Sequence, residues 1–352
     1  MADIMAETKF KYAPDIPEVF RCRVPLPETI QAFVTNGILR EDVSPAPGVT
    51  IRSDNGGKGL NLKLEKGSSS NENIQIISFR DSSDTSDISF SNTFTFEEET
   101  SMEILLCTHT LSLDRFKTEE DINISVGKDA DIEIVVMQNE HNDSDHSVRF
   151  SIDVARGGHL RINVITLHGA MLENEFNVKL SGEGASCELN GAYLVDGCQK
   201  IKTNVMMNHL VPECYSKQLF KGILDNDARA TFTGRIVVAK DAQKTEAYQA
   251  NHNLLISPSA KAYAQPQLEI YADDVKCSHG ATSGRLDENA LFYMRSRGIG
   301  EGEAKILQQQ AFVHEVLENI NNEQLRNRLN DLVESRLRGE FGHCTNCSLN
   351  CC

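Results

Sequence analysis

Cys277 and His279 are two good metal ligands separated by a single residue in the stretch "VKCSH". If this stretch is a β-strand, both side chains point to the same side, with Cα atoms roughly 6.5 Å apart. A thiolate suits iron clusters, and an imidazole is a common iron ligand. Because two ligands leave an iron or a cluster incomplete, the pattern predicts a site shared between two chains. A buried thiol and a hydrogen-bonded imidazole without a metal are the alternative.

A second group of possible ligands lies in the segment "GHCTNCSLNCC" near the end of the sequence. Cys344, Cys347, Cys351 and Cys352, beside His343, form a C-x2-C-x3-C-C pattern. These soft donors could wrap one metal ion or cluster, and could hold or relay iron or sulfide transiently. The alternative is an oxidisable tail without bound metal.

Other residues with reactive side chains fit structural roles better. Cys187 falls on an alternating pattern, where burial explains a thiol more simply than ligation does. Cys214 lies with His209 around Pro212, which suggests a loop or a corner of a coil and a structural role. The "GGKG" stretch at 56–59 lacks the strand and helix that flank a phosphate-binding loop. Asp273 and Asp274 are adjacent, so on a strand they would face opposite ways. We therefore expect a chain that binds no nucleotide itself and is not an enzyme.

The overall composition restricts the possible partners. The sequence has 352 residues and a formal net charge of −16. An acidic surface repels phosphate backbones and anionic lipids, which disfavours binding to nucleic acid or to a membrane. The first twenty residues lack the basic and apolar regions of a secretory signal. We expect a cytoplasmic protein whose ten cysteines are mostly reduced.

Between about residues 88 and 280, apolar and polar residues alternate, which is typical of strands with one buried face. In "DIEIVVM", Ile132, Ile134 and Val136 share one face. A parallel β-helix and an antiparallel sandwich would both produce this alternation, so the period leaves both open. A small residue also follows a polar or glycine turn at irregular intervals of roughly 27 to 43 residues. It appears in "KDADIEI", "GGHLRIN", "EGASCEL", "NDARATF" and "PSAKAYA".

A helical period replaces this pattern after residue 285. Asp287 and Gly298 supply the start and stop signals of a first helix. The segments "EAKILQQQAFVHEVLENI" and "NEQLRNRLNDLVESRLRG" predict two amphipathic helices, which either cap the end of the sheet or dock a partner. Near the N-terminus, the stretch "ETIQAFVTNG" predicts a short helix that Gly37 ends.

These patterns divide the chain into four parts. We expect a Pro-rich N-terminal segment with a short helix, a β core, a helical region and a cysteine-rich tail. Their bounds are 1–50, 51–284, 285–340 and 341–352.

Three segments resemble the SufB/SufD family of iron–sulfur cluster assembly proteins. "QLEIYADDVKCSHGATSGRLDENALFYMRSRGI" is similar to the C-terminal signature of the SufD branch. "PECYSKQLFKGILDNDARATFTGRIVVAKDAQKTEAYQANHNLL" is similar to the segment just upstream, and "INISVGKDADIEIVVMQNE" to an earlier coil. The resemblance runs from about residue 105 to 338 and implies a mainly β fold. It implies a right-handed parallel β-helix core, with a C-terminal α-helical region and a short irregular N-terminal segment.

The resemblance also implies a function. The chain would be a non-catalytic scaffold subunit of a SufBCD complex, paired with a SufB-like paralogue and docking a SufC-like ATPase on its helical region. A transient iron–sulfur cluster or iron would be shared at the SufB–SufD interface. His279 matches the family's motif histidine, and Cys277 matches its motif cysteine. A homodimer is plausible where the paralogue is absent.

The chain departs from the family's pattern in its short N-terminal region and its cysteine-rich tail. Two other functions stay open. One is a β-helix enzyme acting on an acidic polysaccharide, which the net charge of −16 disfavours. The other is a purely structural protein–protein interaction module.

Overall fold

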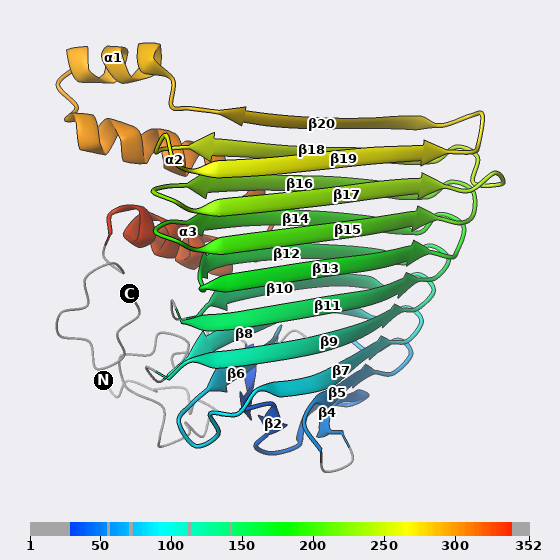
Figure 1. Cartoon of the computed structure of the whole chain (residues 1–352). Helices are drawn as coiled ribbons and strands as arrows, with labels where there is room; N and C mark the ends of the chain where they lie inside the picture. Colours follow the sequence, from blue (N-terminus) through cyan, green and yellow to red (C-terminus); the bar gives the residue numbers. More distant parts are fainter. Residues whose placement is uncertain (1–28, 55–56, 70–72, 112–113, 141–142, 340–352) are drawn as a thin grey trace, which may run out of the picture.

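The structure is a long stack of β-strands with helices along one side (Figure 1). This computed structural model describes residues 29–339, except 55–56, 70–72, 112–113 and 141–142. From β5 and β6 onward, each strand pairs in parallel with the strand two places later in the sequence. This topology confirms the parallel β-helix and rules out the antiparallel sandwich.

The strands form two ten-stranded sheets, here called sheet A and sheet B. In spatial order, sheet A contains β2 (Ile38–Leu39), β1 (Thr29–Thr35), β6 (Asn73–Arg80), β8 (Ser101–Thr110), β10 (Asp131–Asn139), β12 (His159–His168), β14 (Ser186–Val195), β16 (Tyr215–Leu224), β18 (Glu246–Leu255) and β20 (Lys276–Gly284). Sheet B contains β19 (Lys261–Ile270), β17 (Arg229–Val238), β15 (Lys200–His209), β13 (Met171–Leu180), β11 (Ser144–Val154), β9 (Phe116–Val126), β7 (Ile88–Phe96), β5 (Leu60–Leu64), β4 (Val49–Ser53) and β3 (Val43–Ala46).

Successive turns from sheet B to sheet A repeat one backbone conformation. Each has a residue in the left-handed region, with φ between 54° and 71°. Its amide donates to a carbonyl of the next turn, as from Asp129 to the oxygen of Arg156 at 3.0 Å. The following residue is small and buried, as are Ala130, Ala185 and Cys214. The left-handed residues are Glu99, Asp129, Gly157, Gly184, Glu213 and Lys244.

The irregular spacing of the small residues in the sequence has a simple origin. Ala130, Gly158 and Ala185 belong to turns that lead from sheet B to sheet A. Ala228 and Ala260 belong to turns on the other edge, which lead from sheet A to sheet B. The small residues therefore belong to two separate series, one on each edge of the β-helix, and each series has one residue per coil.

The three helices confirm the sequence signals for their starts and ends. Helix α1 (Glu288–Ser296) begins after Asp287, whose side chain accepts from the amides of Asn289 and Ala290. Gly298 follows it with φ 90°. Helices α2 (Glu301–Leu317) and α3 (Glu323–Leu337) complete the region. Among the described residues, the helices are too short or too polar to cross a membrane.

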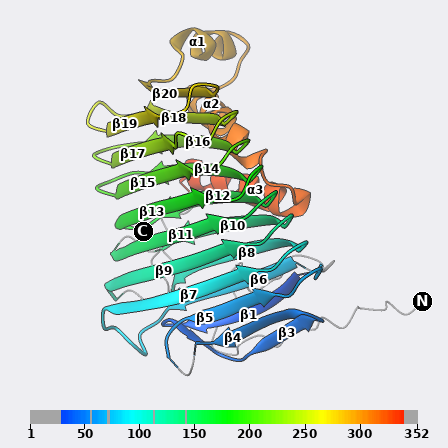
Figure 2. The same cartoon turned by 90° about the vertical axis from the view of Figure 1, so that its right-hand side faces the viewer.

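Helices α2 and α3 cover the outer face of sheet A, so the expectation that they cap its end is wrong (Figure 2). These helices bury that face, so both faces are buried in four strands of sheet A: β10, β12, β14 and β16. In sheet B, by contrast, side chains alternate along each strand between the core and the solvent. Apolar residues of the strands and helices form a second core there. They include Ile77, Leu105, Val135 and Ile165 from the sheet, and Val313, Val316, Leu329 and Leu332 from the helices.

The short helix expected over "ETIQAFVTNG" is also wrong, because most of this stretch is strand β1. Thr29, Phe33 and Val34 favour a strand, and all seven residues pair in parallel with β6. Asn36 and Gly37 have φ of 49° and 81°, so they form the tight turn to β2. The strand region therefore begins at Thr29 rather than near residue 51. The N-terminal part of this segment, residues 1–28, lies outside the described residues.

Candidate metal site at the open end of the β-helix

β20 is the last strand of sheet A, and its outer edge has no partner strand among the described residues (Figure 1). Only Cys277 on this strand is half-buried, and its other residues are exposed. β19 occupies the same position in sheet B. The β-helix therefore ends in two strands that nothing in the described part of the chain covers.

The pairing of β20 with β18 sets the direction of the two candidate ligands. Cys277 pairs with Ala247, and His279 pairs with Gln249. Ala247 and Gln249 are buried inside the β-helix, and partners in a parallel register share one face of the sheet. Cys277 and His279 therefore both lie on the inward face of the terminal coil.

The two side chains differ in their surroundings. Cys277 packs against the apolar interior, and burial raises the pKa of its thiol. A metal that bound this sulfur would have to displace its proton. His279, by contrast, is exposed. No group of three or more His, Cys, Asp or Glu side chains with metal-binding geometry occurs among the residues described here. The tail residues Cys344, Cys347, Cys351 and Cys352 lie outside them.

The coil below this end has a polar interior that the sequence analysis missed. Gln249 Nε2 donates to Gln218 Oε1 at 2.7 Å, and Asn253 Nδ2 donates to Asn251 Oδ1 at 2.7 Å. All four side chains are buried. The signal was available, because Gln249, Asn251 and Asn253 take inward positions of a period-two strand where earlier coils carry apolar residues.

Comparison with known proteins bears directly on this end of the molecule. Residues 79–312 match the family model described as "SUF system FeS cluster assembly, SufBD core domain". The chain belongs to the SufBD family. The matched region runs from the end of β6 through β20 and α1 into α2, so it includes Cys277 and His279.

Individual members of the SufBD family show the same relationship. Iron-sulfur cluster assembly protein SufD of Escherichia coli K12 is 34% identical over 233 residues, which cover 66% of this chain and 55% of that protein. A SufBD family protein of Mycobacterium leprae is 34% identical over 186 residues, covering 51% and 47%. One from Synechocystis is 33% identical over 215 residues, covering 60% and 47%. The chain spans about half the length of these curated relatives.

Polar residues in neighbouring register positions run from β20 toward helix α2 of this SufBD core. Thr282 on β20 contacts the ring of His252 on β18, with 2.6 Å between Oγ1 and Nδ1. His252 pairs in register with Lys221 on β16. Lys221 Nζ lies 2.5 Å from Glu315 Oε2 and 4.8 Å from the ring centroid of Phe312, both on α2. These residues lie on the outer face of sheet A, between strand β20 and helix α2.

Large apolar side chains are exposed near the same end. On α1, which projects beyond β20 in both views, Phe292 is 75% exposed and Tyr293 is 59% exposed (Figures 1 and 2). Tyr263 and Tyr271, beside the edge of sheet B, are 54% and 62% exposed. Exposed aromatic residues in such numbers are typical of an interaction surface.

The buried acidic cluster inside the β-helix has a structural role. His146 lies between two carboxylates, 2.5 Å from Glu140 Oε1 and 3.3 Å from Glu120 Oε2. Burial opposes its charge, but the two carboxylates outweigh burial and raise its pKa to about 10. Asn92 donates to Glu120 at 2.5 Å. The imidazolium therefore balances buried carboxylates in the core, far along the stack from β20 (Figure 1).

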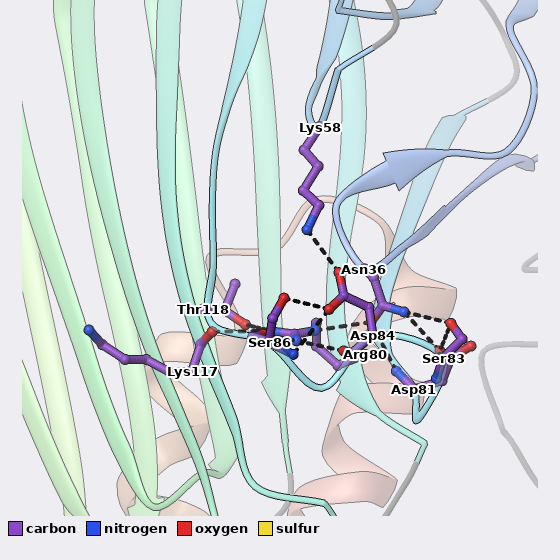
Figure 3. A network of polar contacts seen from close by, with 9 residues as sticks. All are labelled: Asn36, Lys58, Arg80, Asp81, Ser83, Asp84, Ser86, Lys117 and Thr118. Atoms are coloured by element: carbon purple, nitrogen blue, oxygen red, sulfur yellow. Dashed lines mark hydrogen bonds and ion pairs between the residues drawn. The ribbon is translucent and has the colours of Figure 1, made fainter.

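Arg80 is the centre of another polar network, near the N-terminal end (Figure 3). Its guanidinium has five N–H donors. It donates to Asn36 Oδ1, Lys117 O, Thr118 Oγ1, Asp84 O and Ser86 O, at 2.7 to 3.1 Å. All five donors are therefore used within the protein, and Arg80 fastens the turn after β6 to β9 rather than binding an anion.

Three of the four remaining described cysteines are buried and have structural surroundings. Cys187 is buried, and burial raises the pKa of its thiol to about 12. Cys214 fills the small-residue position of its turn, with Sγ 3.5 Å from the oxygen of Gly182. Cys107 is buried and Cys198 is exposed. Burial keeps Cys187 protonated, and a protonated thiol is a poor metal ligand.

Proposed function

We propose that this chain is a SufD-like scaffold subunit of a SufBCD-type complex that assembles iron–sulfur clusters. On its own it would catalyse no reaction. It would contribute His279, together with Cys277, to a site that a SufB-like paralogue completes. The observation that carries this proposal is the position of both ligands on the inward face of an uncovered terminal strand.

The open end favours pairing with a second β-helix. The outer edges of β19 and β20, which no strand of the described residues pairs with, present backbone N–H and C=O groups that another strand can bind. Ile270, which is 42% exposed, and Tyr271 would be buried in such an interface. A second β-helix with a similar end would extend both sheets and bring its own ligands opposite His279. A homodimer is the same arrangement with two copies of this chain.

The helices would dock a SufC-like ATPase. The exposed Phe292 and Tyr293 on α1 supply an apolar contact surface. Movement of α2 would reach β20 through Glu315, Lys221 and His252. The chain would bind no nucleotide itself, so the energy of ATP hydrolysis would come from the partner. Iron, sulfide or the nascent cluster would be cargo at the shared site.

Co-purification from the native source tests the proposed partners. A gentle pull-down of the full chain should recover an ATPase and a second β-helix protein of the SufBD family. Recovery of neither would contradict the proposal. The variant His279→Ala in the co-purified complex should lose cluster formation. A complex that assembles with normal cluster content despite this change would instead indicate a purely structural interaction module.

A further inference from the structure

Gln249 lies directly below His279 at the open end of the β-helix. The two residues pair in register between β18 and β20, and their side chains share the inward face. Adjacent strands are about 4.8 Å apart, which is within reach of a hydrogen bond between two long side chains on the same face. Gln249 is only 3% exposed, whereas His279 reaches solvent.

The amide of Gln249 carries a buried acceptor that is not used. Its Nε2 donates to Gln218 Oε1 at 2.7 Å. Its Oε1 has no hydrogen-bond partner among the described residues. Buried acceptors are rarely left without a partner, so this oxygen marks a place where a donor belongs.

The opposite sheet leaves room for this amide. Gly234 on β17 faces it across the interior, and a Cβ at that position would lie 2.3 Å from Gln249 Nε2 and 2.7 Å from Oε1. Any larger residue would push the amide away. The glycine and the contact with Gln218 therefore hold Gln249 in one position below β20.

We propose that Gln249 is a positioning residue that orients the imidazole of His279. This inference rests on the proposed function, since it concerns the same shared site. On rotation of the exposed ring, one ring N–H of His279 would donate to Gln249 Oε1, and this bond would select which ring nitrogen carries the proton. The other ring nitrogen then directs its lone pair toward the open end, where iron of the nascent cluster would bind. A hydrogen bond of this kind generally orients metal-binding histidines.

The ring tautomer of His279 gives a test that needs no metal. Two-bond proton–nitrogen NMR spectra of the full chain with ¹⁵N-labelled histidine report the protonated nitrogen, and the variant His279→Gln identifies the signals. We expect one dominant tautomer in the wild type and a mixture in Gln249→Met, which keeps the side-chain length but removes the acceptor. Gln249→Glu should restore the single tautomer. Identical His279 signals in Q249M and the wild type would overturn the proposal.

Two further variants keep the test valid if Gln249→Met fails to fold. Gly234→Ala leaves residue 249 unchanged but displaces its amide, so it should produce the same mixture of tautomers. Asn251→Ala is the matched control, because Asn251 is a buried inward-facing amide on the same strand but pairs with Ala281 rather than with His279. It should leave the His279 signals unchanged. A change of equal size in N251A and G234A would overturn the proposal.

Iron binding separates this inference from the proposed function. In the co-purified complex, Gln249→Met should weaken Fe²⁺ binding about 10- to 100-fold, and Asn251→Ala should not. An altered tautomer with unchanged Fe²⁺ affinity would overturn the positioning role. Unchanged cluster content in His279→Ala would overturn the proposed function instead, whatever the tautomer of the ring.

Discussion

His279 lies one strand above Gln249, on the same inward face of sheet A. The parallel register of β18 and β20 positions the histidine, so its location depends on a ladder of backbone hydrogen bonds and not on a flexible loop. A rigid strand gives more precise placement than a loop does. The fold of this chain therefore sets the positions of Cys277 and His279, and in the proposed complex the partner would add the remaining ligands.

Replacing the two candidate ligands should have unequal effects. We expect His279→Ala to lower the cluster content of the co-purified complex at least about tenfold, because a side chain that contacts the cargo is lost. Cys277→Ser should have a smaller effect on cluster content and a measurable one on stability, since Cys277 also packs against the core. Iron content and visible absorbance measure the first effect, and thermal unfolding measures the second.

Ser278→Ala is the matched control for these variants. Ser278 lies between the two ligands on the same strand, is exposed and points to the outer face. Its cluster content should equal that of the wild type. An equal loss in all three variants would show that β20 is sensitive to any change, and would argue against ligation by His279.

Removing the cysteine-rich tail tests the second candidate set. Truncation after Gly342 deletes Cys344, Cys347, Cys351 and Cys352. If these thiols hold or relay iron or sulfide, the cluster yield of the complex should fall, while the melting temperature of the chain stays the same. A serine replacement of all four cysteines should reproduce this loss. A yield equal to that of the full chain would remove the tail from the mechanism.

The contacts of Lys221 should carry movement from α2 to β20. Lys221→Met keeps most of the aliphatic side chain but removes the ion pair with Glu315 and the contact of the charge with Phe312. We expect hydrogen exchange at β20 to lose its dependence on ATP in the co-purified complex. Lys217→Met, on the same strand and face, is the control. If hydrogen exchange at β20 still depends on ATP in K221M, the contacts of Lys221 do not carry the movement.

Glu133 should make the attachment of the helices depend on pH. Its side chain is buried and accepts hydrogen bonds from Asn163 Nδ2 at 2.9 Å and from the backbone amide of Asn321 at 3.2 Å. Because Asn321 lies in the turn between α2 and α3, the second bond attaches this turn to sheet A. Burial raises its pKa to about 7. The folded protein therefore binds the proton more tightly than the unfolded chain, and stability should fall as pH rises from about 4.5 to 7.

The variant Glu133→Gln can accept the same two hydrogen bonds without a charge. Above pH 7 it should be more stable than the wild type by on the order of 2 kcal/mol, and near pH 5 the difference should be small. Denaturant unfolding followed at several pH values measures this. If the free energy of unfolding changes with pH in the same way in E133Q and the wild type, another group is responsible.

Features that depend on neighbouring residues could be predicted from the sequence. Strand alternation in "DIEIVVM", the cap at Asp287 and the stop at Gly298 each need only a few residues of context, and all three appear in the structure. The placement of Cys277 and His279 on one face follows from the alternation of side chains along a strand.

Pairing between distant segments sets which strand is last, which sheet face the helices cover, and which residue lies beneath His279, so none of these could be predicted from the sequence. The segment "ETIQAFVTNG" forms a strand because β6, more than forty residues later, pairs with it. Gln249 lies under His279 because one coil of about thirty residues returns the chain to the same column. Local propensity carries no information about such pairings, since their free energy comes from contacts between residues far apart in the sequence.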